Sequence, residues 1–70
     1  MTYPQLHTLQ IIQAISRRLP CFTVDIARVR QVTTPAASEV VWILIDRGYV
    51  KATQEGLCLT DKGIDATKKA

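Results

Sequence analysis

The chain has 70 residues, of which 47% are hydrophobic and 21% charged, and its net charge is +3. So short a chain forms one domain, residues 1–70, with a small core. Its longest apolar run, residues 40–45, is far below the roughly 18 residues that span a membrane, and its first residues lack the pattern of a signal peptide. We therefore expect a cytoplasmic protein without a membrane partner.

Nine basic residues against six acidic ones favour polyanions such as nucleic acid only mildly. His7 is the only histidine, and the two cysteines lack CxxC spacing, so we expect no metal and no cofactor. No histidine is paired with a nucleophile, and there is no glycine loop for phosphate. Asp61 and Asp65 are four residues apart, but helix capping and solvation explain both carboxylates. The sequence predicts no enzyme.

The first predicted helix covers about residues 4–18. Its apolar residues recur at three- and four-residue spacing, which indicates an amphipathic helix. Pro4 suits its first turn, and Pro20 ends it. The next three residues, CFT, are enough for only one short edge strand. The apolar stripe consists of Leu6, Leu9, Ile11, Ile12, Ile15 and Leu19.

The segment VDIARVRQV predicts a second helix, with Thr23 as its cap. The spacing directs Ile26 and Val29 inward. It directs Arg28 and Arg30 outward. Val24 and Ala27 remain ambiguous.

The third predicted helix has favourable residues at both ends. Thr34 is its expected cap, Pro35 its first helical residue, and Gly48 lies just beyond its end. Between these ends lies the run of six apolar residues.

Two short β-rich runs, YVKAT and GLCLT, flank Gln54-Glu55-Gly56, which suits a hairpin with a three-residue connection. Val50 and Ala52 share one face of the first strand. Leu57 and Leu59 face the core on the second strand. Thr60 then caps a short terminal helix with Asp61 in its first turn.

This order of elements is the layout of a winged helix-turn-helix domain. The fold is α+β, a three-helix bundle with a small antiparallel hairpin wing and a short C-terminal helix. The segment from DIARVRQV to LTDKG resembles the winged-helix DNA-binding domains of MarR- and IclR-type bacterial transcription regulators. The most specific part of the resemblance is RGYV followed by LTDKG. The matching residues are Ile26, Ala27, Val32, Ala37, Leu44, Gly48, Tyr49, Val50, and residues 59–63.

In those regulators the third helix enters the major groove, and the wing touches the flanking backbone. The resemblance thus implies a transcriptional regulator that binds double-stranded DNA. Arg30 and Gln31 replace the family's usual apolar residue and glycine, which predicts a longer or shifted turn between helices two and three. In the family, the outward positions of the third helix usually include arginine, glutamine or serine. Here they are Thr33, Thr34, Ala36, Ser38, Glu39, Trp42 and Ile43.

The candidate DNA contacts combine cations with hydrogen-bonding side chains. We expect Arg28, Arg30, Gln31 and Lys51 around the N-terminal end of the third helix. No arginine, asparagine or glutamine lies between Gln31 and Arg47, so we expect modest sequence specificity. The candidates are Arg28, Arg30, Gln31, Thr33, Thr34, Ser38, Lys51 and Gln54, with Gln31, Thr34 and Ser38 as the groove contacts.

The apolar run leaves a second function open. After the core stripe is subtracted, Trp42, Ile43 and Ile45 are extra apolar residues on the third helix. They could be buried in the core, form a homodimer seam, or form a site for a protein partner. In the alternative reading the domain is a protein-interaction module that uses Trp42 and Ile45.

The two cysteines allow two interpretations. If the CFT strand pairs with the second wing strand, and if Phe22, Leu57 and Leu59 face inward, Cys21 and Cys58 both face outward on neighbouring strands. They are then either within reach of a disulfide or two unrelated reduced thiols.

Overall fold

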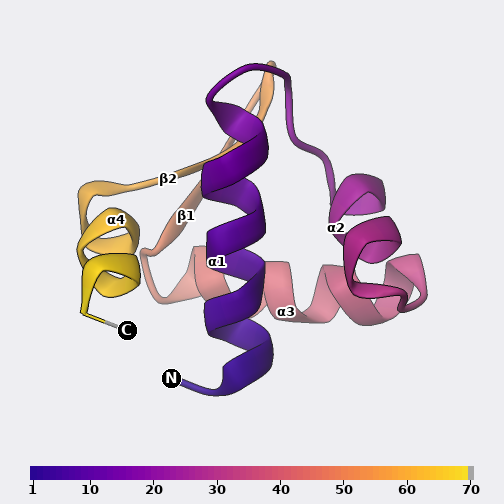
Figure 1. Cartoon of the computed structure of the whole chain (residues 1–70), viewed down its shortest axis with the longest axis horizontal. Coiled ribbons are helices and arrows are strands. Elements are labelled where there is room, and N and C mark those ends of the chain that lie inside the picture. Colours follow the sequence, from indigo (N-terminus) through magenta and orange to yellow (C-terminus); the bar gives the residue numbers. More distant parts are fainter. Residues whose placement is uncertain (70) are drawn as a thin grey trace.

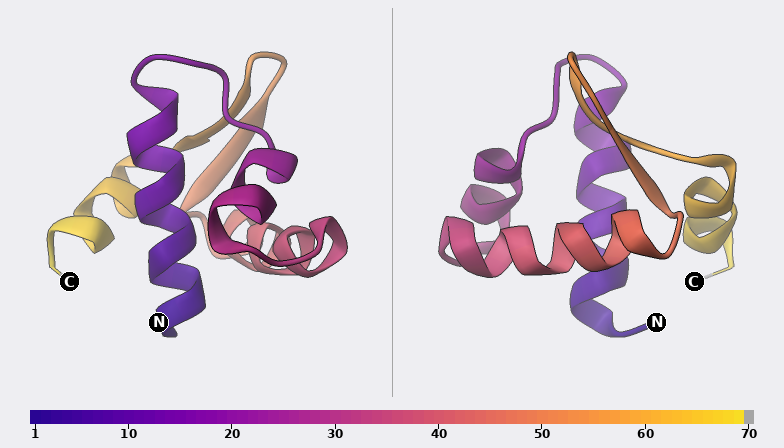
Figure 2. Two further views of the ribbon diagram at one scale, coloured as in Figure 1. Left: turned by 45° about the vertical axis from the view of Figure 1, so that its right-hand side comes forward. Right: turned by 180° about the vertical axis from the view of Figure 1, so that it is seen from behind.

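The computed structural model describes residues 1–69 and contains four helices and one hairpin (Figure 1). Helix α1 forms the central column, α3 crosses it, and α2 and α4 lie on opposite sides (Figures 1 and 2). No helix in the described range is long and apolar enough to cross a membrane. The elements are α1 (Tyr3–Ser16), α2 (Thr23–Arg30), α3 (Thr34–Asp46), β1 (Val50–Thr53), β2 (Gly56–Leu59) and α4 (Asp61–Lys68).

A capping box starts α1 one residue earlier than predicted. The Gln5 N–H donates to Thr2 Oγ1 over 3.4 Å, and the Thr2 N–H donates to Gln5 Oε1 over 3.2 Å. The helix ends at Ser16 rather than at residue 18. Leu19 therefore lies beyond the helix and is 67% exposed, so its place in the buried stripe was predicted wrongly.

One core joins the helices to the hairpin. Its α3 portion is Ala37, Val41 and Leu44, which recur at the spacing of one buried helix face. The other core residues are Leu9, Ile11, Ile12, Cys21, Ile26, Ala27, Val50 and Leu57.

Helix α2 begins at Thr23 with Phe22 as its cap residue, so the predicted Thr23 cap is wrong by one position. The Asp25 carboxylate reaches back and accepts the Phe22 N–H over 3.0 Å. The buried pair is Ile26 and Ala27, whereas Val29 is 54% exposed. The inward placement of Val29 was therefore also wrong.

The turn between α2 and α3 comprises three residues, 31–33. Gln31 adopts the left-handed conformation, with φ 58°, that a glycine would adopt readily. The Val32 N–H then donates to the Ala27 carbonyl over 3.0 Å, which closes the end of α2. Gln31 bears the steric strain of this conformation within the three-residue turn.

Replacing Gln31 by glycine should stabilise the domain by about 0.5–1 kcal/mol, because it removes the side-chain clash in the left-handed region. The greater freedom of glycine in the unfolded chain offsets part of this gain. Urea unfolding measures the change. Gln31→Ala is the matched control, which keeps the Cβ and should not stabilise. Equal stabilities of the glycine and alanine variants would contradict the strain.

The hairpin pairs Val50 with Leu59 and Thr53 with Gly56, so its connection is two residues, not three. Gly56 opens β2 at φ +116°. Val50 and Leu57 are buried as expected, whereas Ala52 is exposed.

The predicted CFT strand is absent from the described sheet, which has two strands. One backbone bond remains of the expected pairing, from the Leu57 N–H to the Cys21 carbonyl over 2.7 Å. The pairing of this segment with β2 extends no further because Thr23 already belongs to α2.

The two sequence motifs RGYV and LTDKG pack against each other. The Thr60 N–H donates to the Tyr49 carbonyl over 3.1 Å, and Lys62 Nζ donates to the Arg47 carbonyl over 2.8 Å. Lys62 Nζ also lies 4.5 Å from the centroid of the Tyr49 ring. Thr60 caps α4 as predicted. A Cβ at Gly63 would overlap the Tyr49 carbonyl oxygen, so no other residue fits there without backbone movement.

Gly63→Ala should lower the free energy of unfolding by about 3 kcal/mol, because the added methyl group meets backbone rather than a movable side chain. Chemical denaturation followed by circular dichroism measures the loss. Lys68→Ala, at an exposed position of the same helix, should stay within about 0.5 kcal/mol of the parent chain. A Gly63→Ala protein as stable as Lys68→Ala would show that this close approach is not a constraint.

Candidate nucleic-acid interface

The N-terminal end of α3 is exposed, but its capping residue is Thr33 rather than Thr34. Thr33 Oγ1 accepts the Ala36 N–H over 3.2 Å. Pro35 has no N–H, so the Thr34 N–H is the first-turn donor left for an outside anion. The helix end therefore offers a phosphate fewer backbone donors than its sequence suggested.

Arg28 fits the predicted site. Its side chain is 76% exposed on α2, and its only ion pair within residues 1–69 is with Asp25 at 3.8 Å. An ion pair this long and this exposed holds an arginine weakly, so the guanidinium can turn to a phosphate. Gln31 and Thr34 are exposed on the same α2–turn–α3 segment.

Arg30 does not point outward as predicted. It is half-buried, and its Nη1 donates to Thr8 Oγ1 on α1 over 3.4 Å. Thr8 is fully buried and donates in turn to the Pro4 carbonyl over 2.7 Å. Arg30 thus joins α2 to α1, so its observed contact stabilises the fold. The signal was its spacing of four and three residues from the buried Ile26 and Ala27.

The wing residues lie apart from the α2–α3 turn. Lys51 is exposed on β1, and Gln54 is exposed in the hairpin turn. Thirteen residues make α3 about 20 Å long, and β1 follows its C-terminal end. The prediction that Lys51 surrounds the N-terminal end of α3 is therefore wrong. The candidate contacts form two zones, one at the α2–α3 turn and one on the wing (Figure 2).

The outward face of α3 carries no basic side chain. Ser38 is half-buried, while Glu39 and Asp46 are exposed. Trp42 is 68% exposed and Ile43 39% exposed. Ile45 packs partly against the core, so its role in the alternative protein site is not supported by exposure.

The two cysteines are free thiols in the structure. Cys21 is fully buried and does not face outward, contrary to expectation. Burial raises the pKa of its thiol from 9.0 to about 11, and the nearby Asp25 carboxylate adds to this rise. Cys21 is therefore a protonated core residue at neutral pH, with little thiolate available for oxidation.

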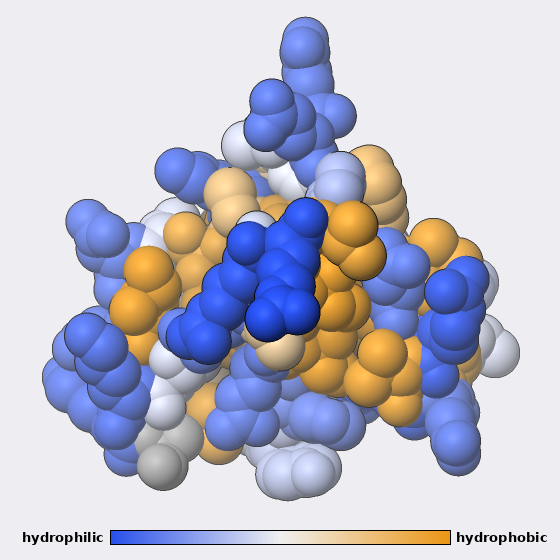
Figure 3. Space-filling model, turned by 45° about the horizontal axis from the view of Figure 1, so that its top comes forward, coloured by the Kyte–Doolittle hydropathy of each residue, from blue (hydrophilic) through white to orange (hydrophobic). Residues whose placement is uncertain are grey.

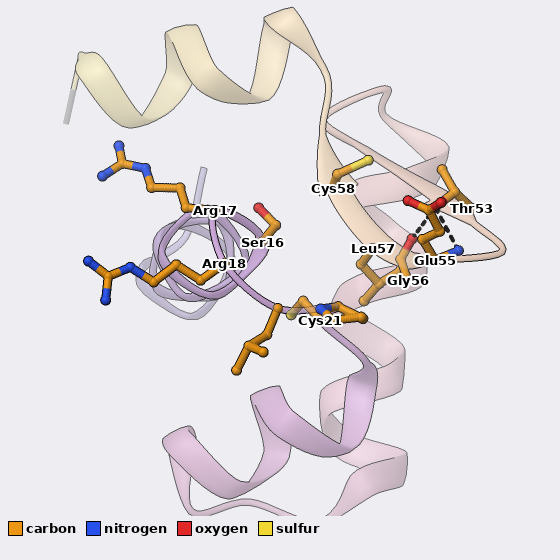
Figure 4. Close-up of a pocket in the computed structure, with 11 residues that line it drawn as sticks. Ser16, Arg17, Arg18, Cys21, Thr53, Glu55, Gly56, Leu57 and Cys58 are labelled. Atoms are coloured by element: carbon orange, nitrogen blue, oxygen red, sulfur yellow. Dashed lines mark hydrogen bonds between the residues drawn. The ribbon is translucent and has the colours of Figure 1, made fainter.

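A shallow groove of about 290 Å³ lies between the end of α1 and the hairpin (Figure 4). Ser16, Thr53, Gly56 and Cys58 are among the residues that line it. Its polar side chains come from the end of α1, from the residues directly after it and from both strands and the turn of the hairpin.

The sequence matches no protein-family model and no curated protein, but the fold matches solved structures closely. The MarR family protein Rv2887 of Mycobacterium tuberculosis, in complex with DNA, matches 99% of this chain at TM-score 0.81 and 26% identity. MepR, a transcription regulator of the Staphylococcus aureus multidrug efflux pump MepA, matches 99% of it at TM-score 0.91 and 26% identity. The chain has the winged-helix fold of these MarR-type regulators.

A structure of the MepR–DNA complex also matches 99% of the chain, at TM-score 0.83 and 25% identity. The chain spans about half the length of these proteins, namely 53% of MepR and 52% of Rv2887. Both predicted motif blocks, RGYV and LTDKG, belong to the junction that closes the fold. The α+β winged-helix prediction is thus confirmed.

Proposed function

We propose that this MarR-type domain binds double-stranded DNA and serves a transcriptional regulator. The observation that carries the proposal is its match, over 99% of its length, to two proteins solved in complex with DNA. The exposed polar and cationic residues at both ends of α3 support it. One zone holds Arg28, Gln31 and Thr34, and the other holds Lys51 and Gln54.

The geometry favours binding through phosphates over base readout. The two zones hold cations and neutral donors, which suit the DNA backbone. Between them, α3 presents Glu39 and Asp46, which repel phosphates and lack the donors that read guanine. We therefore propose modest sequence specificity, with Thr33 and Ser38 contributing secondary contacts beside Thr34.

Anisotropy titration of a labelled duplex tests the proposal. Affinity should fall steeply with added salt, and Lys51→Ala should lower it for every sequence and reduce the slope of log K against log salt by about 1. Arg28→Ala should act in the same way. Lys68→Ala is the matched control on α4, away from both zones, and should change binding little. Absence of binding at low salt would refute the proposed function.

Comparing Arg30→Ala with Arg28→Ala distinguishes an effect on DNA contact from an effect on folding stability. Because Arg30 donates to Thr8, its loss should reduce stability as well as binding, whereas Arg28→Ala should reduce binding alone.

A second candidate function is protein contact through α3, as its exposed tryptophan favours. Trp42 is 68% exposed, and aromatic residues of this kind anchor protein interfaces. Trp42→Ala should remove such a protein contact and leave the salt-dependent affinity for DNA unchanged. Loss of DNA binding alone in this variant would place Trp42 in the DNA interface instead.

A further inference from the structure

One face of α3 combines negative charge with apolar surface. Glu39, Trp42, Ile43 and Asp46 recur at spacings of three, four and seven residues and so form one stripe, which we call the acidic face. Trp42 is 68% exposed and Ile43 39% exposed. Among residues 1–69, no cation lies within 4 Å of either carboxylate, so both charges are directed to solvent.

The end of α1 carries the opposite combination. Arg17 and Arg18 are exposed and lie beside Leu19, which is 67% exposed, and Phe22, which is 48% exposed. We call these four residues the basic end. Both guanidinium groups point away from the hairpin (Figure 4), and strongly hydrophilic side chains lie next to an apolar patch on the upper surface (Figure 3). Within the described chain, neither arginine forms an ion pair.

We propose that the acidic face of one copy docks on the basic end of a second copy. The two carboxylates match the two guanidinium groups in number and sign, and Leu19 and Phe22 offer an apolar partner to Trp42. An arginine placed over the Trp42 ring would add a cation–π contact. This proposal names the partner for the second candidate function and does not depend on DNA binding.

A symmetric seam centred on Trp42 fits less well. It would place the Glu39 and Asp46 carboxylates of both copies against each other, which like charge disfavours. The basic end lies at the top of α1, whereas α3, which carries the acidic face, crosses the lower half of the molecule (Figure 1). Such a contact is head-to-tail, so it extends from copy to copy and need not stop at two.

Head-to-tail docking would also cover part of the proposed DNA surface. The acidic face lies between the α2–α3 turn and the wing on the same helix. A docked copy and a duplex would therefore compete for α3. Four residues on each side make a small contact, so we expect weak association that strengthens with concentration and weakens with salt.

Sedimentation equilibrium and Trp42 fluorescence, both without DNA, measure the association. Trp42 is the only tryptophan, so its emission reports the acidic face directly. Between about 10 μM and about 1 mM at low salt, the weight-average mass should rise past twice the monomer mass while the emission shifts to the blue. High salt should reverse both changes. A monomer throughout this range, or a dimer that does not grow, would overturn the proposal.

Charge exchange tests the pairing itself. Glu39→Arg with Asp46→Arg should abolish association, and so should Arg17→Glu with Arg18→Glu. An equimolar mixture of these two variants should restore it, because each reversed patch then meets its complement. All four positions are exposed, so the folds should survive, as circular dichroism can verify.

The matched control keeps the same net charge but moves the change to α4. Lys68→Glu with Lys69→Glu should leave self-association intact, with the same dependence on salt. Loss of self-association in this control would show general charge attraction and would overturn the assigned contact. Failure of the proposed DNA binding would leave every one of these outcomes unchanged.

Discussion

The close contact between the start of α4 and the turn after α3 holds this fold together. Gly63 lies against the Tyr49 carbonyl, and Lys62 binds the Arg47 carbonyl at the end of α3. Both strands of the hairpin begin or end at this junction, since β1 follows Tyr49 and β2 precedes Thr60. The direction of the wing relative to α3 therefore depends on it. Together with the buried Val50 and Leu57, the junction fixes the spacing of the two proposed DNA-contact zones.

The buried stripe of α3 decides what remains for function. Because Ala37, Val41 and Leu44 face the core, the opposite side of the helix is left with acidic and apolar residues and no arginine or lysine. A winged-helix domain built in this way has its cations near the ends of α3 rather than along it. From this arrangement we propose that the domain binds the DNA backbone and that copies of the chain contact one another through α3.

Much of the fold follows from local patterns in the sequence. Helical spacing, proline and glycine positions and the Thr60 cap predicted the four helices and the wing. Caps were misplaced where neighbours compete, as in the Thr33–Thr34 pair, since either hydroxyl can cap and only the backbone angles decide. The contact of Arg30 with Thr8 was not predicted because a long side chain can lie along a buried face. The left-handed backbone angle of Gln31 was not predicted because this conformation is typical of glycine.

The exposed surface was harder to predict than the core. Trp42 and Ile45 look alike in the sequence, but only the packing of α3 shows that one is open and the other half-buried. The separation of Lys51 from the start of α3 likewise depends on helix length and chain path.

The most direct test of the account is an amide-shift NMR titration of the ¹⁵N-labelled chain with a short DNA duplex at low salt. We predict that the shifts concentrate at the α2–α3 turn, the first turn of α3 and the wing, and leave the end of α4 unchanged. Shifts confined to α4, or none at saturating duplex, would contradict it.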